Sequence, residues 1–227
     1  MDEDIPTLSF KNEGIGNDAV KRFAERSLLR FVQEDLRRLE NMVCQILNFP
    51  RLGVQLRHVL NIAEQAGGLQ LCTTLLQAHL AGDWAQVNAI ACCEAGGFIF
   101  ASALAFRVGT PLALIREAGK LPPPTASVVK SPSHVSSPTP HNGNGTTIET
   151  VRDIFRKCKS VVVVDDVLTT GKTLCAVLRL LGKAGVASER ISVTVVAEFA
   201  FHRGRELLRQ NGFGRVAIDS LLVFSGA

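Results

Sequence analysis

Four consecutive valines, Val161 to Val164, constrain the fold of this 227-residue chain more than any other feature. An unbroken β-branched run is typical of a strand that is buried on both faces, because a half-exposed strand would alternate apolar and polar residues. Strands of this kind occur in parallel sheets whose two faces are covered by helices. The run therefore predicts an α/β fold with a parallel sheet flanked by helices.

The residues after the valines are two acids and a small, hydroxyl-rich loop. Asp165 and Asp166 come first, and the loop from Thr169 to Thr173 leads into apolar residues at helical spacing. Ligands of open α/β sheets bind at the carboxyl ends of the strands. Backbone N–H groups at the start of a helix suit a phosphate, and carboxylates accept hydrogen bonds from vicinal hydroxyl groups. The segment thus predicts a binding site for a ribose phosphate.

Three other interpretations use parts of the same segment. An apolar run before two acids resembles the Mg²⁺-holding strand of a nucleotide hydrolase, and the sequence Gly171-Lys172-Thr173 resembles the end of a P-loop. A P-loop requires glycine five residues before Gly171, where this chain has Asp166. An ordinary buried strand followed by a capped helix is the remaining structural alternative.

Strands and helices are predicted to alternate over most of the chain, as in a helix-covered parallel sheet. Residues 1–48 form an N-terminal arm and a helix that begins at Asn17 and ends at Phe49-Pro50, and residues 49–227 form one domain. A segment rich in proline, serine and glycine interrupts that domain, and we expect residues 125–148 to be a long mobile loop. The other expected strands are 89–93, 111–116, 160–164, 191–197 and 216–224, and the other expected helices are 69–80, 98–107, 173–182 and 203–211.

Composition excludes several classes of function. Hydrophobic residues make up 46% of the chain and charged residues 20%, which is typical of a soluble globular protein. The net charge of +4 comes from scattered residues, so we expect no nucleic-acid partner. No apolar segment is long and uninterrupted enough to span a membrane. The six cysteines show no C-x-x-C spacing and mostly lie in apolar segments, which favours reduced, buried thiols and a cytoplasmic protein.

The segment from Val161 to Thr173 resembles the motif with which type I phosphoribosyltransferases bind phosphoribosyl pyrophosphate (PRPP). The segment Ile115 to Pro122 is similar to the Ile-Arg-x-x-Gly-Lys-Leu-Pro element of the adenine branch of that family. Shorter likenesses cover the family's pyrophosphate loop, its base-binding segment and the region that closes over the base, at 94–98, 49–57 and 198–206. The resemblance runs from about Cys44 to Phe224 and implies the type I phosphoribosyltransferase fold, here with an N-terminal helical extension.

The resemblance also implies an activity. Ribose 5-phosphate is transferred from PRPP to a purine base, adenine first, and pyrophosphate is released. Asp165 and Asp166 hold the ribose hydroxyl groups and favour the positive charge of an oxocarbenium-like transition state. The implied ligands of the 5-phosphate are Thr169, Thr170, Gly171, Lys172 and Thr173, those of the pyrophosphate are Glu94, Ala95, Gly96, Arg116 and Lys120, and those of the base are Leu56, Arg57 and Phe199. Mg²⁺ enters as the cofactor with PRPP, with no residue assigned as its direct ligand, and the family resemblance favours a homodimer.

Several positions differ from the family pattern. Gly96 stands where the pyrophosphate loop has arginine, Leu56 replaces the aromatic residue that stacks on the base, and Lys172 replaces a glycine. The family's loop pair Glu-Tyr corresponds to Ser133 and His134, and we expect His134 to act as a general acid or base. These differences leave two alternatives: a non-catalytic homologue that binds PRPP or a nucleotide as a regulator or sensor, and a transferase for another base or a specialised acceptor.

Overall fold

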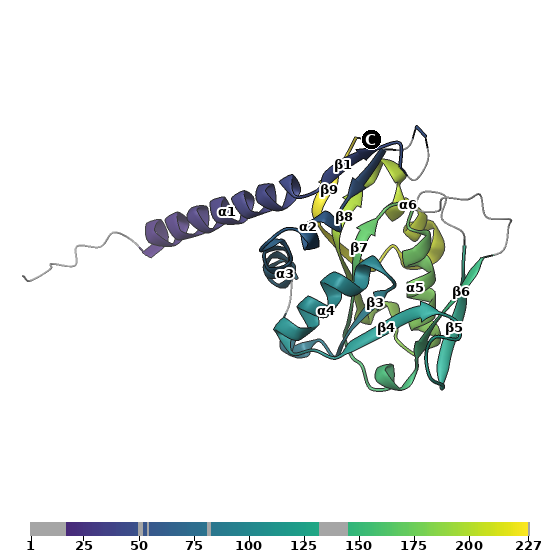
Figure 1. The fold of residues 1–227 in the computed structure, drawn as a ribbon. Coiled ribbons are helices and arrows are strands. Elements are labelled where there is room, and N and C mark those ends of the chain that lie inside the picture. Colours follow the sequence, from purple (N-terminus) through teal and green to yellow (C-terminus); the bar gives the residue numbers. More distant parts are fainter. Residues whose placement is uncertain (1–16, 50–51, 54, 81–82, 132–144, 227) are drawn as a thin grey trace, which may run out of the picture.

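The computed structural model describes residues 17–49, 52–53, 55–80, 83–131 and 145–226. Figure 1 shows a sheet with helices on both faces and a long N-terminal helix that extends away from this body. The helices are α1 (Asn17–Asn41), α2 (Asn61–Glu64), α3 (Gly68–His79), α4 (Gly96–Val108), α5 (Lys172–Lys183) and α6 (Gly204–Leu208). The strands are β1 (Cys44–Leu47), β2 (Gln55–His58), β3 (Ala89–Cys93), β4 (Leu112–Glu117), β5 (Thr125–Lys130), β6 (Thr146–Val151), β7 (Val161–Leu168), β8 (Ile191–Phe199) and β9 (Ala217–Phe224).

The central sheet has seven strands in the order β5-β6-β4-β3-β7-β8-β9. Strands β4, β3, β7, β8 and β9 run parallel to one another, which confirms the predicted α/β class. The sheet as a whole is mixed, because β6 pairs antiparallel with both β4 and β5. From β3 the chain continues to β4 on one side, whereas from β7 it continues to β8 and β9 on the other side, so the strand order reverses between β3 and β7. A crevice at the carboxyl ends of β3 and β7 is therefore where a ligand is expected.

The expectation of a mobile loop over residues 125–148 was wrong at both ends of that segment. Residues Thr125–Lys130 form β5, and β6 begins at Thr146. The two strands form an antiparallel pair whose inward side chains, among them Ala126 and Ile148, are buried against α5. Burial of these side chains offsets the entropy cost of ordering a proline- and serine-rich segment. The middle of the segment, 132–144, lies outside the described residues.

The valine run of β7 is buried on both faces of the sheet, as predicted. Val161 and Val163 pack in a cluster with α5, whereas Val162 and Val164 pack in a second cluster with α3 and α4. Complete burial stabilises the fold by about 1.5–3 kcal/mol for each side chain of this size. The run therefore holds both layers of helices to one strand, and it fixes the position of the residues that follow it.

The N-terminal helix ends earlier than its sequence pattern suggested. Helix α1 stops at Asn41, and β1 follows and pairs antiparallel with β2. This hairpin crosses the expected domain boundary between residues 48 and 49, so β1 belongs with the α/β domain. In Figure 1 the hairpin lies at the same end of the sheet as α6. Among the described residues, no helix is long and apolar enough to cross a membrane.

Candidate active site

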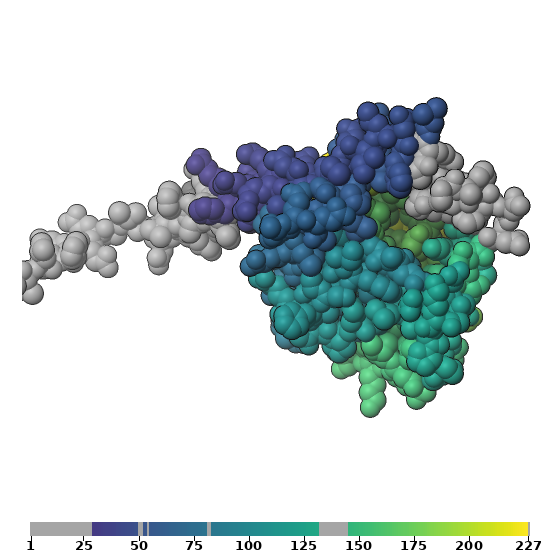
Figure 2. Space-filling model, viewed as in Figure 1, coloured from purple at the N-terminus to yellow at the C-terminus, as the bar shows by residue number. Residues whose placement is uncertain are grey.

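A cavity of about 480 Å³ opens at the carboxyl ends of β3 and β7, where the sheet order predicts a ligand. Figure 2 shows the recess below the β1–β2 hairpin. The expected site residues that line it are Leu56, Arg57, Glu94, Ala95, Gly96, Asp165, Asp166, Thr169, Gly171, Thr173 and Phe199. Four other expected site residues are not among those that line the cavity: Arg116, Lys120, Thr170 and Lys172. His134 lies outside the described residues.

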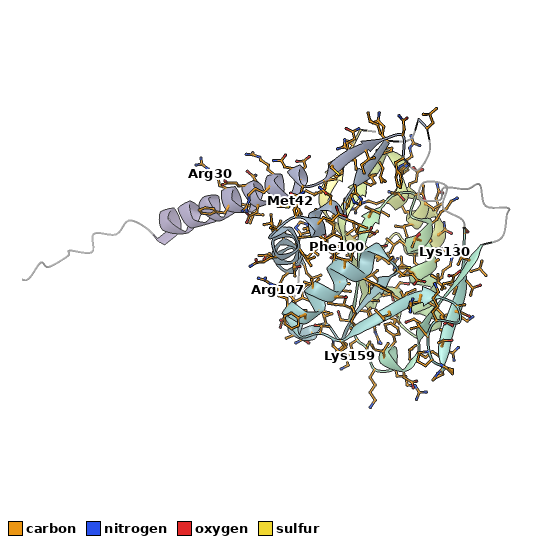
Figure 3. The ribbon with its side chains drawn as sticks, viewed as in Figure 1. Arg30, Met42, Phe100, Arg107, Lys130 and Lys159 are labelled. Atoms are coloured by element: carbon orange, nitrogen blue, oxygen red, sulfur yellow. The ribbon has the colours of Figure 1, made fainter. Side chains whose placement is uncertain are left out.

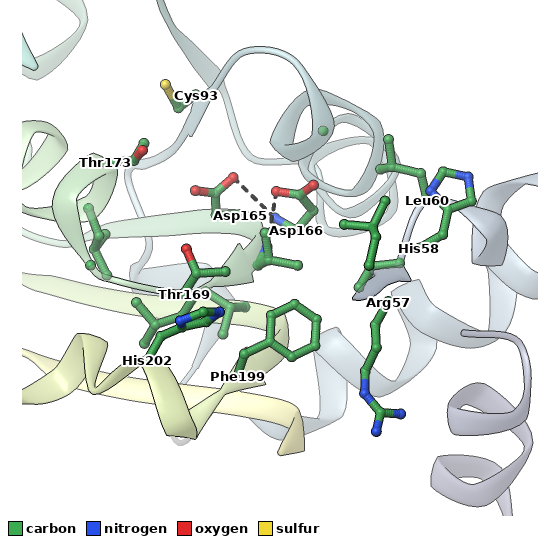
Figure 4. Close-up of a pocket in the computed structure, with 18 of the residues that line it drawn as sticks. Arg57, His58, Leu60, Cys93, Asp165, Asp166, Thr169, Thr173, Phe199 and His202 are labelled. Carbon is green, nitrogen blue, oxygen red and sulfur yellow. Dashed lines mark hydrogen bonds between the residues drawn. The ribbon is translucent and has the colours of Figure 1, made fainter. Parts of the chain in front are cut away.

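The two acids lie in the second half of β7 and face the cavity (Figure 4). The backbone N–H of Asp166 donates to Oδ1 of Asp165 over 3.1 Å, and the N–H of Val167 donates to Oδ1 of Asp166 over 3.0 Å. Burial raises the pKa of Asp165 well above its ordinary value, and the nearby Asp166 carboxylate raises it further. Burial also raises the pKa of Asp166. Such a pair accepts hydrogen bonds from hydroxyl groups and strongly attracts positive charge.

Two glycines at the start of α4 make room for these carboxylates. A Cβ on Gly96 would lie 2.1 Å from Oδ2 of Asp166, and a Cβ on Gly97 would lie 2.7 Å from Oδ1 of Asp165. Neither position therefore accepts a side chain unless an acid moves. The absence of a side chain at position 96, where the family has arginine, leaves room for the Asp166 carboxylate in this arrangement of the acids.

The loop after β7 presents backbone and hydroxyl groups to the cavity. Thr169, Gly171 and Thr173 line it, and the twelve-residue helix α5 begins immediately after Gly171. Gly171 has φ +77°, and a Cβ there would meet the carbonyl oxygen of Gly204 at 2.7 Å. The start of a helix offers unpaired N–H groups to an anion, so the loop can bind a phosphate group beside the two acids.

A clamp between Glu198 and Arg205 supports that loop from behind. Arg205 donates to both carboxylate oxygens of Glu198 over 2.7–3.0 Å, and the hydroxyl of Ser220 donates to Oε2 over 2.6 Å. Burial acts to raise the pKa of Glu198, but these hydrogen bonds outweigh it, and the pKa is lowered. The clamp fixes the start of α6 and thereby the backbone of Gly204, which contacts the phosphate loop.

The two cations expected to meet pyrophosphate are engaged with an acid at the end of β3. Nε of Arg116 lies 3.1 Å from Glu94, and Nζ of Lys120 lies 3.7 Å from Glu94 and 2.9 Å from Glu117. Glu149 of β6 holds the same region, accepting hydrogen bonds from the backbone around Lys120 and from a threonine of β5. Sequence reasoning missed Glu149 because it lies at the edge of the segment that was expected to be mobile.

The opposite wall of the cavity is apolar and aromatic. Leu56 and Phe199 line it, and the Arg57 guanidinium lies 4.4 Å from the ring centroid of Phe224, which packs against Phe199 at 5.6 Å. This wall can contact a flat base on one side. The sequence pattern did not reveal that Arg57 binds an aromatic ring, because its partner is at the other end of the chain.

Other lining residues escaped sequence reasoning, among them Phe201, His202 and Lys130. The rings of Phe201 and His202 are tilted by 42° with centroids 4.2 Å apart, and burial lowers the pKa of His202, which favours its neutral form. Lys130 enters from the end of β5, inside the segment that was expected to be mobile. The β-branched residues before Lys130 were the signal that a strand delivers it to the site.

The thiols follow their predicted role. All six cysteines are free, and Cys92 and Cys93 belong to the clusters on opposite faces of the sheet. Burial and the nearby negative charge of Asp165 raise the pKa of Cys93 to about 12. Cys93 lines the cavity as a protonated thiol, which is a poor nucleophile.

The carboxylates also fit a divalent cation that binds together with a phosphate. Mg²⁺ prefers oxygen ligands and is usually bound through one or two carboxylates plus substrate phosphates. Asp165 and Asp166 supply such oxygens beside the phosphate loop. Within the described ranges, no group of three or more histidine, cysteine or acidic side chains is placed to hold a metal ion.

The fold and the cavity together define a class: an α/β protein with a cavity at the switch point of its sheet, lined by two acids and by a loop that can bind phosphate. The chain belongs to the family of proteins with a phosphoribosyl transferase domain, whose model matches residues 58–215. It is 31% identical to the adenine phosphoribosyltransferase of Syntrophotalea carbinolica over 175 residues, which cover 77% of this chain and 93% of that protein. It is 32% identical to the enzyme of that name from Mycolicibacterium smegmatis over 168 residues, which cover 74% and 86% of the two chains.

Solved structures agree with this assignment. The fold is similar to that of the APRTase from Giardia lamblia, solved in complex with 9-deazaadenine, with a TM-score of 0.72 and 25% identity over 84% of this chain and 98% of that one. It is also similar to the adenine phosphoribosyltransferase from Thermoanaerobacter pseudethanolicus, with a TM-score of 0.68 and 27% identity over 83% and 99% of the chains. The predicted type I phosphoribosyltransferase fold is thereby confirmed.

Proposed function

We propose that this chain is an adenine phosphoribosyltransferase, which transfers ribose 5-phosphate from PRPP to adenine and releases pyrophosphate and AMP. One observation carries the proposal: Asp165 and Asp166 face the phosphate loop across a single cavity at the switch point of the sheet. The relatives that carry the name adenine phosphoribosyltransferase support adenine as the base. The apolar wall formed by Leu56 and Phe199 suits a flat heterocycle.

The residues of the cavity match the charges that develop in this reaction. The bond from C1 of ribose to the pyrophosphate oxygen breaks, the bond from C1 to a nitrogen of the base forms, and that nitrogen loses its proton. Positive charge grows on the sugar next to Asp165 and Asp166, and ionised carboxylates stabilise it. The phosphate loop holds the 5-phosphate, so the sugar is positioned between its own phosphate and the base.

Mg²⁺ bound with the diphosphate of PRPP supplies positive charge to the leaving group. Asp165 and Asp166 are the residues of this chain that would contact such an ion or its water ligands. A cation at this position also favours the ionised form of both acids, whose pKa values burial raises. Binding of the substrate with its cation thus favours the ionised carboxylates, which stabilise the positive charge of the transition state.

The proposal is tested with purified protein, PRPP and Mg²⁺, supplied in turn with adenine, hypoxanthine and guanine. Pyrophosphate release with adenine is the expected result, and the Asp165→Asn variant is the matched negative control. Pyrophosphate release with only hypoxanthine or only guanine would show that this base, and not adenine, is the substrate. Binding of PRPP by calorimetry without release, with any of the three bases, would contradict catalysis.

A second candidate function is a non-catalytic homologue that binds PRPP or a nucleotide. The pairing of Arg116 and Lys120 with Glu94 and the lack of a side chain at Gly96 favour it, since these features reduce the positive charge that faces the leaving group.

His134 is the residue on which proton transfer would depend. A lower rate in His134→Ala, with unchanged affinity for PRPP, supports that role, and an unchanged rate contradicts it.

We also propose that the protein is a homodimer that uses the outer part of α1. Leu29, Phe31 and Val32 are exposed by 61%, 66% and 36% on a helix that stands away from the body in Figure 1. Leu29 and Val32, three positions apart, share one face of this helix, and exposed apolar residues that share a face are typical of an interface. Sedimentation of the wild type should give the mass of a dimer, and Leu29→Glu with Val32→Glu should give a monomer. A wild-type protein that sediments as a monomer would contradict the proposal.

A further inference from the structure

The diphosphate of PRPP needs positive charge inside the cavity, and the cations expected to supply it are directed elsewhere. Arg116 and Lys120 both contact Glu94 and lie outside the described lining of the cavity. A Cβ on Gly96 would overlap with Asp166, so an arginine cannot replace this glycine while the acid stays in place. The remaining question is which cation of this chain faces the leaving group.

The described lining of the cavity contains one arginine and one lysine side chain, Arg57 and Lys130. Arg57 is on the wall assigned to the base, where its guanidinium lies over the Phe224 ring. Lys130 comes from the last position of β5, on the other side of the cavity. In Figure 3 it lies on the side of the molecule formed by β5, β6 and α5.

The charge of Lys130 acts on both strands that border the crevice. Its ammonium group opposes the rise in the pKa of Asp165 on β7, and it opposes the rise in the pKa of the Cys93 thiol on β3. Cys93 is the residue immediately before Glu94, Ala95 and Gly96. Lys130 lines the same cavity as Asp165 and as residues 94–96, the loop that is expected to surround the pyrophosphate.

We propose that Lys130 binds the diphosphate group of PRPP and neutralises the charge that grows on the leaving pyrophosphate. The inference rests on the proposed function, because it assigns a residue to that same substrate. A lysine suits this role, since its ammonium is a compact charge on a flexible stem that can follow a phosphate as it departs. Lys130, at the end of β5, thus supplies a positive charge that the family's arginine would supply from position 96 at the start of α4.

The test compares Lys130→Gln and Lys130→Arg with the wild type and with Lys159→Gln. Lys159 is exposed, lies at the lower edge of the molecule in Figure 3 and does not line the cavity, so its replacement removes the same charge away from the site. Calorimetry in the presence of Mg²⁺ measures the affinity for pyrophosphate and, separately, for AMP. Steady-state rates give KM for PRPP and for adenine.

Lys130→Gln should weaken pyrophosphate binding and raise KM for PRPP by about 10- to 100-fold, the range of one hydrogen bond to a charged group. AMP carries no diphosphate, so its affinity and KM for adenine should change by less than about threefold. Lys130→Arg should restore most of the pyrophosphate affinity, and Lys159→Gln should match the wild type. Equal losses for pyrophosphate and AMP would overturn the assignment, because they would show that Lys130 only supports Asp165.

Failure of the inference is distinguishable from failure of the proposed function. A wild type that binds pyrophosphate and transfers ribose 5-phosphate to adenine, together with a Lys130→Gln variant of unchanged pyrophosphate affinity, overturns the role of Lys130 alone. A wild type that binds neither pyrophosphate nor AMP overturns both.

Discussion

The two halves of the cavity are built in different ways. The half that is proposed to bind the ribose phosphate, residues 165–173, is one continuous segment that runs from β7 into α5. The half that is proposed to bind the diphosphate consists of Glu94, Gly96 and Lys130, which come from the ends of β3 and β5 and the start of α4. The first half is a single stretch of backbone, whereas the second depends on how separate strands pack. We therefore expect substitutions in the first half to abolish binding and those in the second to weaken it.

The strongest test of this comparison removes both charges from the ribose-phosphate half. Asp165→Asn combined with Asp166→Asn should lower the affinity for PRPP with Mg²⁺ by about 1,000-fold or more, because two charged hydrogen-bond acceptors are lost. Calorimetry measures this affinity. A double variant that binds PRPP as well as the wild type would place the substrate elsewhere on the molecule.

The same variant should melt at or above the temperature of the wild type. Burial raises the pKa of both acids, so their ionised forms destabilise the fold at pH values above the ordinary carboxyl range. Neutral amides of the same shape remove that cost, which is about 1.4 kcal/mol for each unit of raised pKa. Melting well below the wild type would show instead that the carboxylates stabilise the fold.

A smaller effect is expected from a change in the diphosphate half. Gly96→Ala places a methyl group 2.1 Å from Oδ2 of Asp166 and should displace the carboxylate by a large fraction of an ångström. A misplacement of this size costs about 100-fold in rate, so kcat/KM for PRPP should fall by about that factor. Steady-state kinetics with varied PRPP measure it.

Gly182→Ala is the matched control for that prediction. Gly182 lies in α5, and a Cβ there meets nothing within 4 Å. Its replacement should leave the kinetics unchanged and stabilise the helix by about 0.5–1 kcal/mol. If Gly96→Ala were as active as Gly182→Ala, Asp166 would be free to move, and the steric account of the glycine would fail.

The difference between the halves also explains what could be predicted from the sequence. The segment from Val161 to Thr173 predicted its own strand, loop and helix, because the apolar run, the glycine turn and the helical spacing that specify them are local in the sequence. The acids lie within β7, which extends four residues beyond the predicted end at Val164. Hydrogen bonding to β8 outweighed the polarity of these residues.

The diphosphate half could not be predicted because its contacts are between distant segments. The pairing of Arg116 with Glu94 spans 22 residues, and the approach of Gly96 to Asp166 spans 70. Lys130 was assigned to a mobile loop, since the pairing of β5 with β6 is visible only once both strands are seen against α5. The sequence shows which acids and cations are present in these segments, but only the folded structure shows that Lys130 lines the cavity.

The Glu198–Arg205 clamp tests whether the ribose-phosphate half also needs support from outside its own segment. Glu198→Gln removes the charge from a carboxylate that is 6% exposed and should destabilise the protein by about 2 kcal/mol, allowing for the partial exposure of Arg205. Denaturant unfolding measures the loss. Unchanged stability would show that α6 is held mainly by apolar packing.

The clamp also gives a pH dependence with a defined sign. The pKa of Glu198 is lower in the folded protein than its ordinary value of 4.5, so the ionised clamp stabilises the fold fully above that pH. This contribution is lost as the pH falls below 4.5 toward the lowered value. The difference in stability between wild type and Glu198→Gln should therefore shrink on acidification, and a constant difference would contradict the assignment.

The smallest expected effect concerns the wall that contacts the base, which belongs to neither half. Arg57→Met keeps the apolar stem of the side chain and removes the guanidinium that lies 4.4 Å from the Phe224 ring centroid. A cation–π contact at a partly exposed site contributes about 0.5–1 kcal/mol to the order of this wall, so its loss should raise KM for adenine by at most about two- to fivefold. KM for PRPP should change less, because Arg57 lies against Phe224 on the wall assigned to the base. Arg156→Met, which removes an exposed arginine in the segment before β7, is the control. A rise in KM for PRPP equal to that for adenine would show that Arg57 acts on the whole cavity, and the separation of the base wall from the two phosphate halves would then be wrong.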